Sequence, residues 1–204
     1  MYVPQAFDEG RVDVLHACIR AHPLGALVSV GPDGLDANHI PFLIDPEPAP
    51  FGTLRGHVAR ANPAWRKLTA HADTLVIFQG PHAYVTPSWY PAKRAHGKVV
   101  PTWNYVVVHA YGRARVIHEA QWLQQLVTRL TNEHEGNRAE PWKVSDAPEG
   151  FVARQLRAIV GIEVPLARLI GKWKASQNRS QVEIESVRSG LAADGNAFAA
   201  VMQE

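Results

Sequence analysis

The sequence has little cysteine, no long apolar run and almost no net charge. Its 204 residues include one cysteine, Cys18. No disulfide can therefore form within the chain, which is typical of proteins in a reducing compartment. No stretch approaches the roughly 18 uninterrupted apolar residues of a membrane helix. The N-terminal MYVPQAFDEG lacks the basic and apolar regions of a signal peptide. We therefore expect a cytoplasmic protein with no membrane partner.

Several common functional signatures are also missing. A formal net charge of +2 is too small to indicate nucleic-acid binding. The chain has no glycine-rich phosphate loop, no Gly-x-Ser-x-Gly elbow and no His-Glu-x-x-His helix. The ten histidines show no metal-binding spacing, although His39, His57 and His109 fall on predicted strands. We expect no metal, and no residue is identifiable as a catalytic acid or base, so the sequence leaves open whether the protein is an enzyme.

The chain does contain closely spaced apolar segments that are typical of strands. Helical patterns are confined to the two ends and to a few connections. This order favours an α+β fold with a closed or nearly closed antiparallel barrel over βαβ alternation. The predicted strands are 25–30, 35–44, 53–59, 74–78, 105–117, 159–166 and 169–175, and the predicted helices are 9–21, 63–68, 119–133, 149–157 and two within 181–203. No linker or repeat is present, so we expect a single domain over residues 1–204.

The most unusual stretch, residues 84–109, concentrates aromatic rings. Two aromatic and polar clusters, Ser88-Trp89-Tyr90 and residues 102–105, flank a basic connection at residues 91–98. The three prolines of this stretch favour stiff turns over helix. Flat rings beside cations suit a planar, anionic ligand, but a hairpin that packs its rings into a core explains the pattern equally well.

Two further segments carry groups that bind anions. In GHVARANPAW, residues 56–65, a strand ends near Arg60, and Asn62-Pro63 then opens a helix. A guanidinium beside the free N–H groups of a helix start would bind phosphate, although a plain strand-to-helix turn is the alternative. In GKWKASQNR, residues 171–179, strand alternation places Lys172, Lys174 and Ser176 on one face. That face suits either an anionic ligand or a solvated edge strand.

Taken in order, these segments resemble the PaiB family of FMN-binding negative transcriptional regulators. The resemblance rests on MYVPQAF, GHVARANPAW, AYVTPSWY, VVPTWNYVVVHAYG, IVGIEV and GKWKASQNR, which together span nearly the whole chain. The family is similar to the pyridoxamine-phosphate-oxidase-like barrels. It implies an α+β fold with an antiparallel split β-barrel and peripheral helices, forming one FMN-binding domain over residues 1–204 with a C-terminal helical extension. It also implies a homodimer with FMN at the subunit interface.

The resemblance further implies which residues meet FMN. Residues 38–42 would run along the isoalloxazine ring, residues 57–62 would hold the phosphate, and residues 102–104 would line the flavin from the partner subunit. Where many barrel oxidases have a later lysine, this chain has residues Asn62-Pro63-Ala64, which leaves Arg60 as the natural charge partner. The implied cofactor-binding residues are His39, Ile40, Pro41, His57, Val58, Ala59, Arg60, Asn62, Thr102, Trp103, Asn104, Lys174, Ser176 and Gln177.

The function that the resemblance implies is negative regulation of transcription, with a DNA or regulatory partner that no motif in the sequence supports by itself. The alternative is a flavin-dependent oxidoreductase of the pyridoxamine-phosphate-oxidase-like class, in which FMN carries the redox chemistry. Haem handling by a split barrel is a third and weaker alternative. In each case, Ser88-Trp89-Tyr90 and the basic connection are expected to face a second molecule in the pocket.

Overall fold

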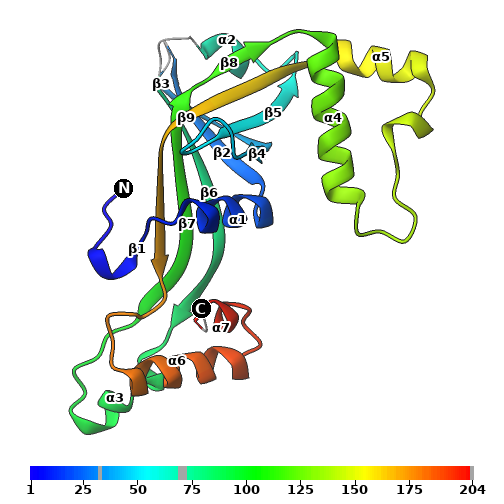
Figure 1. Cartoon of the computed structure of the whole chain (residues 1–204). Helices are drawn as coiled ribbons and strands as arrows, with labels where there is room; N and C mark the ends of the chain where they lie inside the picture. The colour runs from blue at the N-terminus through cyan, green and yellow to red at the C-terminus, as the bar shows by residue number, and fades with distance from the viewer. Residues whose placement is uncertain (32–33, 69–72, 203–204) are drawn as a thin grey trace. The chain divides into compact units, whose positions relative to one another are not determined.

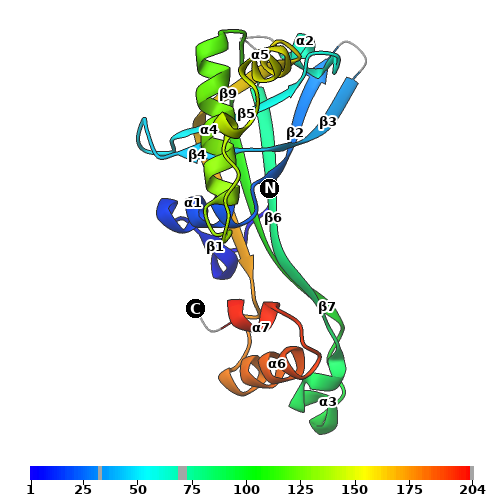
Figure 2. The same cartoon turned by 90° about the vertical axis from the view of Figure 1, so that its right-hand side faces the viewer.

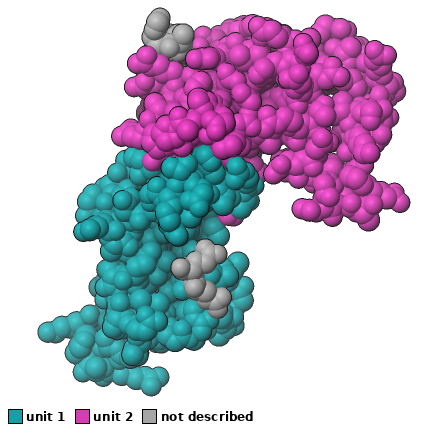
Figure 3. Space-filling view, in the orientation of Figure 1, with its two compact units in different colours: residues 1–21, 79–109, 170–204 teal, residues 22–78, 110–169 magenta. Residues whose placement is uncertain are grey.

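The computed structural model describes residues 1–31, 34–68 and 73–202, and it divides into two compact units (Figures 1 and 3). Unit 1 comprises Met1–Ala21, Gln79–His109 and Ile170–Glu204, and unit 2 comprises His22–Phe78 and Ala110–Leu169. Three long strands contribute residues to both units: β6 (Asp73–Val85), β7 (Thr102–Arg113) and β9 (Ile159–Lys174). The expectation of a single domain over residues 1–204 stays a prediction.

The strands form an antiparallel sheet with the order β3-β2-β6-β7-β9-β5-β4. Two short strands, β1 and β8, pair with β9 outside this path. Apolar patterns in the sequence predicted most of these strands, and β2, β5, β6 and β7 bury alternate side chains along much of their length. The remaining strands are β1 (Asp8–Glu9), β2 (Leu24–Gly31), β3 (Gly34–Pro41), β4 (Leu43–Asp45), β5 (Thr53–Ala59) and β8 (Arg115–Ile117). The predicted turn at residues 31–34 includes positions outside the described residues.

The core of unit 2 includes two phenylalanine rings, Phe42 between β3 and β4 and Phe78 on β6. Phe42 and Phe78 are 1% and 0% exposed, and their rings meet edge to face with centroids 6.0 Å apart. The prediction of one strand over residues 35–44 was wrong, because the chain leaves the ladder at Phe42. The N–H of Phe42 still bonds to the carbonyl of Pro23 at 2.9 Å, but Pro23 has no N–H group to return the bond, so the paired ladder ends at Pro41.

Helix α4 (Ala120–Glu135) covers β4 and β5 of unit 2 (Figure 2). Its buried stripe packs Leu126 and Leu130 against Leu43 of β4, and Trp122 is partly buried beside them. The 3-10 helix η3 (Val144–Asp146) and helix α5 (Glu149–Arg157) follow, while the short α2 (Ala64–Lys67) precedes β6. No helix in the described ranges is long and apolar enough to cross a membrane.

Unit 1 begins with the 3-10 helix η1 (Gln5–Phe7), strand β1 and helix α1 (Val12–Ala21). The prediction that helix starts at residue 9 was wrong, because Asp8 and Glu9 pair with Lys172 and Gly171 of β9. Helix α1 packs closely on this pair of strands. A Cβ atom at Gly171 would lie 2.3 Å from a side-chain carbon of Leu15, so only glycine permits the approach.

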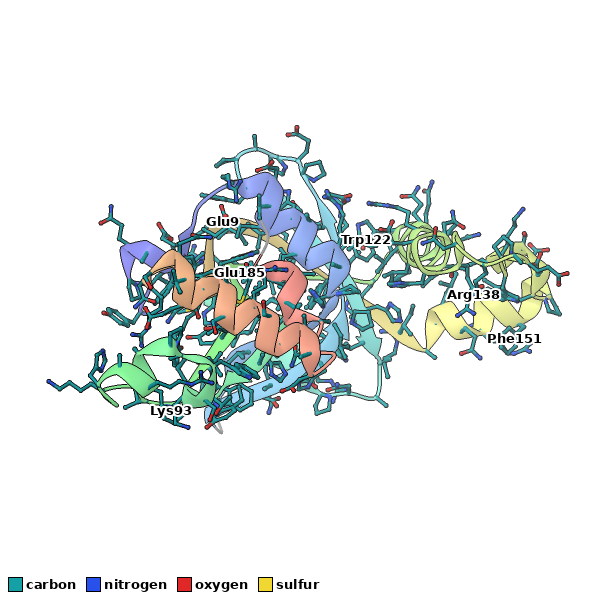
Figure 4. All side chains as sticks on the ribbon, turned by 90° about the horizontal axis from the view of Figure 1, so that it is seen from below. Glu9, Lys93, Trp122, Arg138, Phe151 and Glu185 are labelled. Carbon is teal, nitrogen blue, oxygen red and sulfur yellow. The ribbon has the colours of Figure 1, made fainter. Side chains whose placement is uncertain are left out.

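The aromatic stretch of unit 1 is more helical than its prolines predicted. It forms the 3-10 helix η2 (Pro87–Trp89) and helix α3 (Pro91–Ala95), each with a proline at its first turn, where the missing N–H is not needed. The tail forms α6 (Gln181–Ala193) and α7 (Phe198–Val201), and α6 lies beside α3 (Figures 1 and 2). Lys93 of the basic connection is exposed on α3 (Figure 4).

Helix α6 covers the rings that were expected to face a second molecule. A Cβ atom at Gly190 would lie 2.5 Å from the Trp89 ring, and the hydroxyl of Ser186 donates to the carbonyl of Trp89. Tyr90 is 2% exposed, and the guanidinium of Arg179 lies 5.1 Å from its ring centroid. The expectation was therefore wrong for Trp89 and Tyr90, because these rings pack against the C-terminal helix.

The single cysteine supports one chemical prediction. Cys18 is buried on α1, and burial raises the pKa of its thiol to about 11 because the thiolate would be poorly solvated. The thiol therefore stays protonated at neutral pH. We expect an aromatic disulfide reagent to modify the native protein far more slowly than the denaturant-unfolded protein, as measured by release of the coloured thiolate. Rapid stoichiometric modification of the folded protein would contradict this prediction.

Candidate functional site

The predicted cofactor residues fall into two groups, one in each compact unit. The unit 2 group consists of His39, Ile40, Pro41, His57, Val58, Ala59, Arg60 and Asn62. The unit 1 group consists of Thr102, Trp103, Asn104, Lys174, Ser176 and Gln177.

Strand β3 presents alternate side chains to solvent. His39 and Pro41 lie on its exposed face, whereas Ile40 is 2% exposed and belongs to the core. Since β3 ends the strand order, one of its edges carries backbone groups with no ladder partner among the described strands. The exposed face and the open edge therefore offer both packing surface and backbone hydrogen bonds to a flat ligand.

Arg60 follows β5 and is held in place by main-chain carbonyls. Its Nε donates to the carbonyl of Arg157 at 2.8 Å, and its Nη2 donates to the carbonyl of Ile159 at 2.9 Å. Its Nη1 lies 3.5 Å from Nδ1 of His118. Carbonyls orient a guanidinium without cancelling its charge, and among the described residues no carboxylate lies within ion-pair distance of Arg60. The arginine is thus fixed and still able to pair with an anion.

A cavity of about 600 Å³ opens beside this guanidinium. We call it the Arg60 pocket. Its basic groups are Arg60, Arg157 and His118, and none of its lining residues is acidic. The full lining is Arg60, His118, Ala120, Leu123, Gln124, Ala153, Leu156 and Arg157. Sequence reasoning missed Arg157 and His118, because they reach Arg60 only through pairing of β5 with β9 and packing of α4 and α5.

Asn62 lies just before helix α2 and links this segment to β3. Its Oδ1 accepts the N–H of Ala64 at 2.9 Å, and its Nδ2 donates to Oδ1 of Asn38 at 2.9 Å. The predicted N-cap at Asn62 was wrong by one residue, because α2 begins at Ala64 and has Pro63 at its N-cap. Val58 points into the core at 7% exposure, and Ala59 is exposed at the end of β5. In this structure both polar atoms of the Asn62 amide are therefore hydrogen-bonded to neighbouring residues. The predicted bond of Asn62 to FMN stays a prediction.

His57 lines a different cavity, of about 250 Å³, between β5 and the two helices α4 and α5. Apolar side chains form most of its wall, and they include Trp142 and Phe151 at the outer side; Phe151 is seen on α5 in Figure 4. The Nδ1 atom of His57 is buried with no hydrogen-bond partner among the described residues. Burial lowers the pKa of His57, because the charged imidazolium is poorly solvated there. The ring is therefore neutral near pH 7.

The lowered pKa of His57 predicts a pH-dependent contribution to stability. The unfolded chain binds this proton more readily than the folded chain, so the contribution is complete above the ordinary histidine pKa of about 6.5 and is lost as the pH falls below it. We expect the free energy of unfolding to fall less between about pH 7 and pH 5 in His57→Phe than in the wild type. Urea unfolding at each pH measures this change. His134→Phe, an exposed position on α4, serves as the control. Equal losses in His57→Phe and the wild type would rule the effect out.

The unit 1 group includes an exposed aromatic cluster. The Trp103 ring is 53% exposed and lies 5.7 Å from the ring of His82 and 6.0 Å from that of Tyr84, centroid to centroid. We call these three residues the Trp103 face. Nζ of Lys174 donates to Oγ1 of Thr102 and to the carbonyl of Trp103, and burial lowers the pKa of this lysine. The lysine thus anchors the start of β7, where the rings remain open to a planar ligand.

The other members of the unit 1 group support this arrangement from inside. Asn104 and Ser176 are 0% and 4% exposed, and Nδ2 of Asn104 donates to Oγ of Ser176 at 2.9 Å. Ser176 has a backbone φ of 67°, which is uncommon for a side chain with a Cβ atom. Gln177 closes the turn by accepting from the N–H of Ala175 and donating to the carbonyl of Trp173. Contact of these residues with FMN stays a prediction, since their polar atoms meet each other here.

In the part of the chain that the structure describes, no set of side chains is arranged as a metal site. No group of three or more His, Cys, Asp or Glu side chains there could hold an ion. The described chain thus offers an aromatic face, an exposed strand face and a basic pocket, which are features suited to a planar molecule with an anionic end.

Comparison with known proteins identifies the class. Residues 1–168 match the family model described as "Putative FMN-binding domain". The chain belongs to this family of FMN-binding domains, in agreement with the resemblance drawn from its motifs. It is 30% identical to the protease synthase and sporulation protein PAI 2 of Bacillus subtilis, across 100% of this chain and 95% of that protein. It is also 36% identical to a protein of Emericella nidulans, across 94% of this chain and 90% of the relative.

Solved structures share the fold at low sequence identity. The FAD and haem binding protein of Mycobacterium smegmatis aligns with a TM-score of 0.64 at 14% identity, over 88% of this chain and 78% of that one. The flavocytochrome Anf3 of Azotobacter vinelandii aligns with a TM-score of 0.62 at 13% identity, over 84% of this chain and 72% of that one. These matches and the antiparallel sheet confirm the predicted α+β split-barrel class.

Proposed function

We propose that this protein binds FMN, with the phosphate in the Arg60 pocket, and that it acts as a PaiB-like negative regulator of transcription. The observation that carries the flavin part is the pocket itself. It holds two arginines, it has no acidic lining residue, and one of its guanidinium groups is already fixed by two carbonyls. A dianionic phosphate ester is the ligand whose charge best balances the two guanidinium groups of this pocket.

The residues around the pocket also fit the rest of FMN, because they offer hydrogen-bond donors for the phosphate and a packing surface for the isoalloxazine. An arginine has five N–H bonds, and Arg60 gives two of them to carbonyls, so others are available to phosphate oxygens. His39 and Pro41 would lie along the isoalloxazine, with the open edge of β3 supplying backbone groups. Thr102 and Trp103 would come from the partner subunit. When bound, FMN would supply one- and two-electron redox chemistry, and the protein would supply the pocket and its orientation.

Exposed apolar side chains support the homodimer part of the proposal. Leu35 of β3 is 79% exposed, and Leu24 and Val30 of the neighbouring β2 are each 59% exposed. Large apolar side chains on a sheet edge are typical of surfaces that a second molecule covers. The mass of the FMN-loaded protein in solution tests this: we expect twice the 22.5 kDa chain mass, and a monomer with FMN fully bound would overturn the interface.

The regulatory part of the proposal is supported by the name of the Bacillus subtilis relative, which links that protein to protease synthesis and sporulation. The test is binding of the FMN-loaded protein to DNA from upstream of its own gene, compared with a scrambled duplex at fixed ionic strength. We expect preference for the upstream fragment that persists at physiological salt. Weak binding that is equal for both duplexes and vanishes with salt is only non-specific attraction and would contradict direct DNA recognition.

A flavin-dependent oxidoreductase is the second candidate, and the Trp103 face favours it. Rings that are open to solvent could cover a planar substrate next to the flavin. Turnover of a reduced nicotinamide cofactor or of pyridoxamine phosphate by the FMN-loaded protein would support this function. Bound flavin without such reactivity would support regulation.

One measurement tests the shared premise of both candidates. We expect the purified protein, alone or after addition of FMN and gel filtration, to show the absorption bands of protein-bound flavin. A colourless protein that takes up no FMN would overturn the proposal, and a Soret band in place of the flavin bands would indicate haem.

A further inference from the structure

A second basic cavity lies within unit 2, away from the residues that line the Arg60 pocket. It has a volume of about 630 Å³ and forms where β6 begins, β7 ends and β9 passes. We call it the Arg168 cavity. It is lined by Asp73, Tyr111, Gly112, Arg113, Ala114, Arg115, Pro165, Ala167 and Arg168. It shares no lining residue with the Arg60 pocket.

Arg168 lies over an aromatic ring and is not paired with a carboxylate. Its guanidinium carbon lies 3.8 Å from the ring centroid of Tyr111, which is within cation–π distance. Among the residues that the structure describes, no carboxylate lies within ion-pair distance of Arg168. A guanidinium that interacts with a ring keeps N–H groups that can donate to phosphate oxygens.

The other two arginines of the cavity are only weakly paired. Arg113 lies 3.4 Å from Asp73, and both side chains are largely exposed. Arg115 lies 3.9 Å from Glu163, a carboxylate that Arg55 already holds at 3.0 Å. Exposed pairs of this kind contribute little and exchange readily with another anion. The lining therefore carries three guanidinium groups against one carboxylate.

The backbone shapes the cavity through Gly112. A Cβ atom there would lie 2.2 Å from the carbonyl oxygen of Pro165, so a side chain would force β7 away from β9. Glycine lets the two strands approach, and its neighbours Tyr111 and Arg113 then project on the same side of β7. The aromatic ring and the guanidinium are thus placed on one wall by strand geometry.

We propose that the Arg168 cavity binds a nucleoside di- or triphosphate. The three guanidinium groups provide the charge for a polyphosphate chain, and the outer face of Arg168, stacked on Tyr111, offers a flat cationic surface for a base. The volume lies within the range of about 300–1,000 Å³ that small-molecule sites occupy and exceeds the need of a lone phosphate. The site is separate from the proposed flavin site and does not depend on it.

The test is calorimetric titration of the full-length protein with ATP and with pyrophosphate at fixed ionic strength, first as purified and then in the presence of FMN. We expect ATP to bind more tightly than pyrophosphate. We expect Arg168→Gln to weaken ATP binding by about tenfold or more, as loss of a charged hydrogen bond does. Arg115→Gln should weaken it as well. Arg20→Gln, an exposed arginine on α1, is the control and should bind ATP as the wild type does.

Four outcomes would overturn the proposal. They are the absence of binding heat with ATP, ATP affinity unchanged in Arg168→Gln, equal affinity for ATP and pyrophosphate, and displacement of ATP by excess FMN, which would place ATP in the flavin site. Competition of ATP by a DNA duplex in an Arg168-dependent manner would instead identify this surface as a nucleic-acid contact. The thermal midpoint of each variant, compared with the wild type, separates lost binding from lost folding. If Arg168→Gln does not fold, Arg115→Gln and charge-retaining Arg168→Lys carry the same test.

Discussion

Replacing Arg60 with alanine is expected to weaken FMN binding by about 10- to 150-fold. A hydrogen bond to a charged group contributes about 1.5–3 kcal/mol, and each 1.4 kcal/mol corresponds to a factor of ten in the dissociation constant. Arg60 has this effect because its guanidinium is fixed by the carbonyls of Arg157 and Ile159, so little further ordering is needed when phosphate binds. Titration of FMN fluorescence with wild-type and variant protein measures the change.

Controls for the Arg60 variant must separate binding from scaffold, since the same side chain ties β5 to β9. Arg66→Ala removes an exposed arginine from nearby α2, where the guanidinium only stacks on Trp65, and should leave FMN affinity unchanged. Arg60→Lys keeps the charge but not the two-pronged geometry and should give an intermediate affinity. Wild-type FMN affinity in a folded Arg60→Ala protein would remove this residue from the phosphate site.

Replacing Phe42 with alanine is expected to destabilise the FMN-free protein by about 3–5 kcal/mol, a large part of the stability of an ordinary domain. Phe42 is 1% exposed, and its ring meets the Phe78 ring edge to face. The substitution therefore loses the favourable free energy of burying a large ring and also an aromatic contact. The midpoint and slope of urea unfolding, followed by circular dichroism, give the difference in free energy of unfolding.

Two comparisons make the Phe42 prediction specific. Phe42→Leu keeps most of the volume and should cost less than half as much. Phe151→Ala removes a ring that is 45% exposed on α5 and should change stability by well under the Phe42→Ala value. A loss below about 1 kcal/mol for Phe42→Ala would show that the unit 2 core does not depend on this ring.

Local patterns in the sequence determined several elements closely. Strand β5 and helix α5 have the predicted bounds, because their alternating and helical patterns each end at a clear local signal. The short helix after Asn62 also forms, although it begins one residue later than predicted, at Ala64. The lengths of β6 and β9 were underestimated. Gly80-Pro81 was interpreted as a connection after the strand 74–78, and residues 167–168 as a gap between two strands, but β6 and β9 each continue through these residues.

Contacts between distant residues account for what the sequence did not predict. Tyr90 is buried and lies beside Arg179, while Gly190 of α6 lies against Trp89, so both contacts come from residues about 90–100 positions further along the chain. Arg157 joins Arg60 only through the alignment of β5 with β9, and no local pattern marks it. The basic cavity at Arg168 was not predicted for the same reason, since its arginines come from three strands, β7, β8 and β9, and Arg168 is more than 50 residues from the other two.

The pairing of β1 with the end of β9 sets an order of events during protein synthesis. Asp8 emerges from the ribosome long before its partner Lys172, whereas unit 2 has all its residues once Leu169 has been made. We therefore expect unit 2 to fold first on the growing chain. The apolar side of α1 can pack against β9 only after Gly171 has been synthesised. During that interval Leu15 and Ile19 are exposed, and the nascent chain is then most open to chaperones and to aggregation.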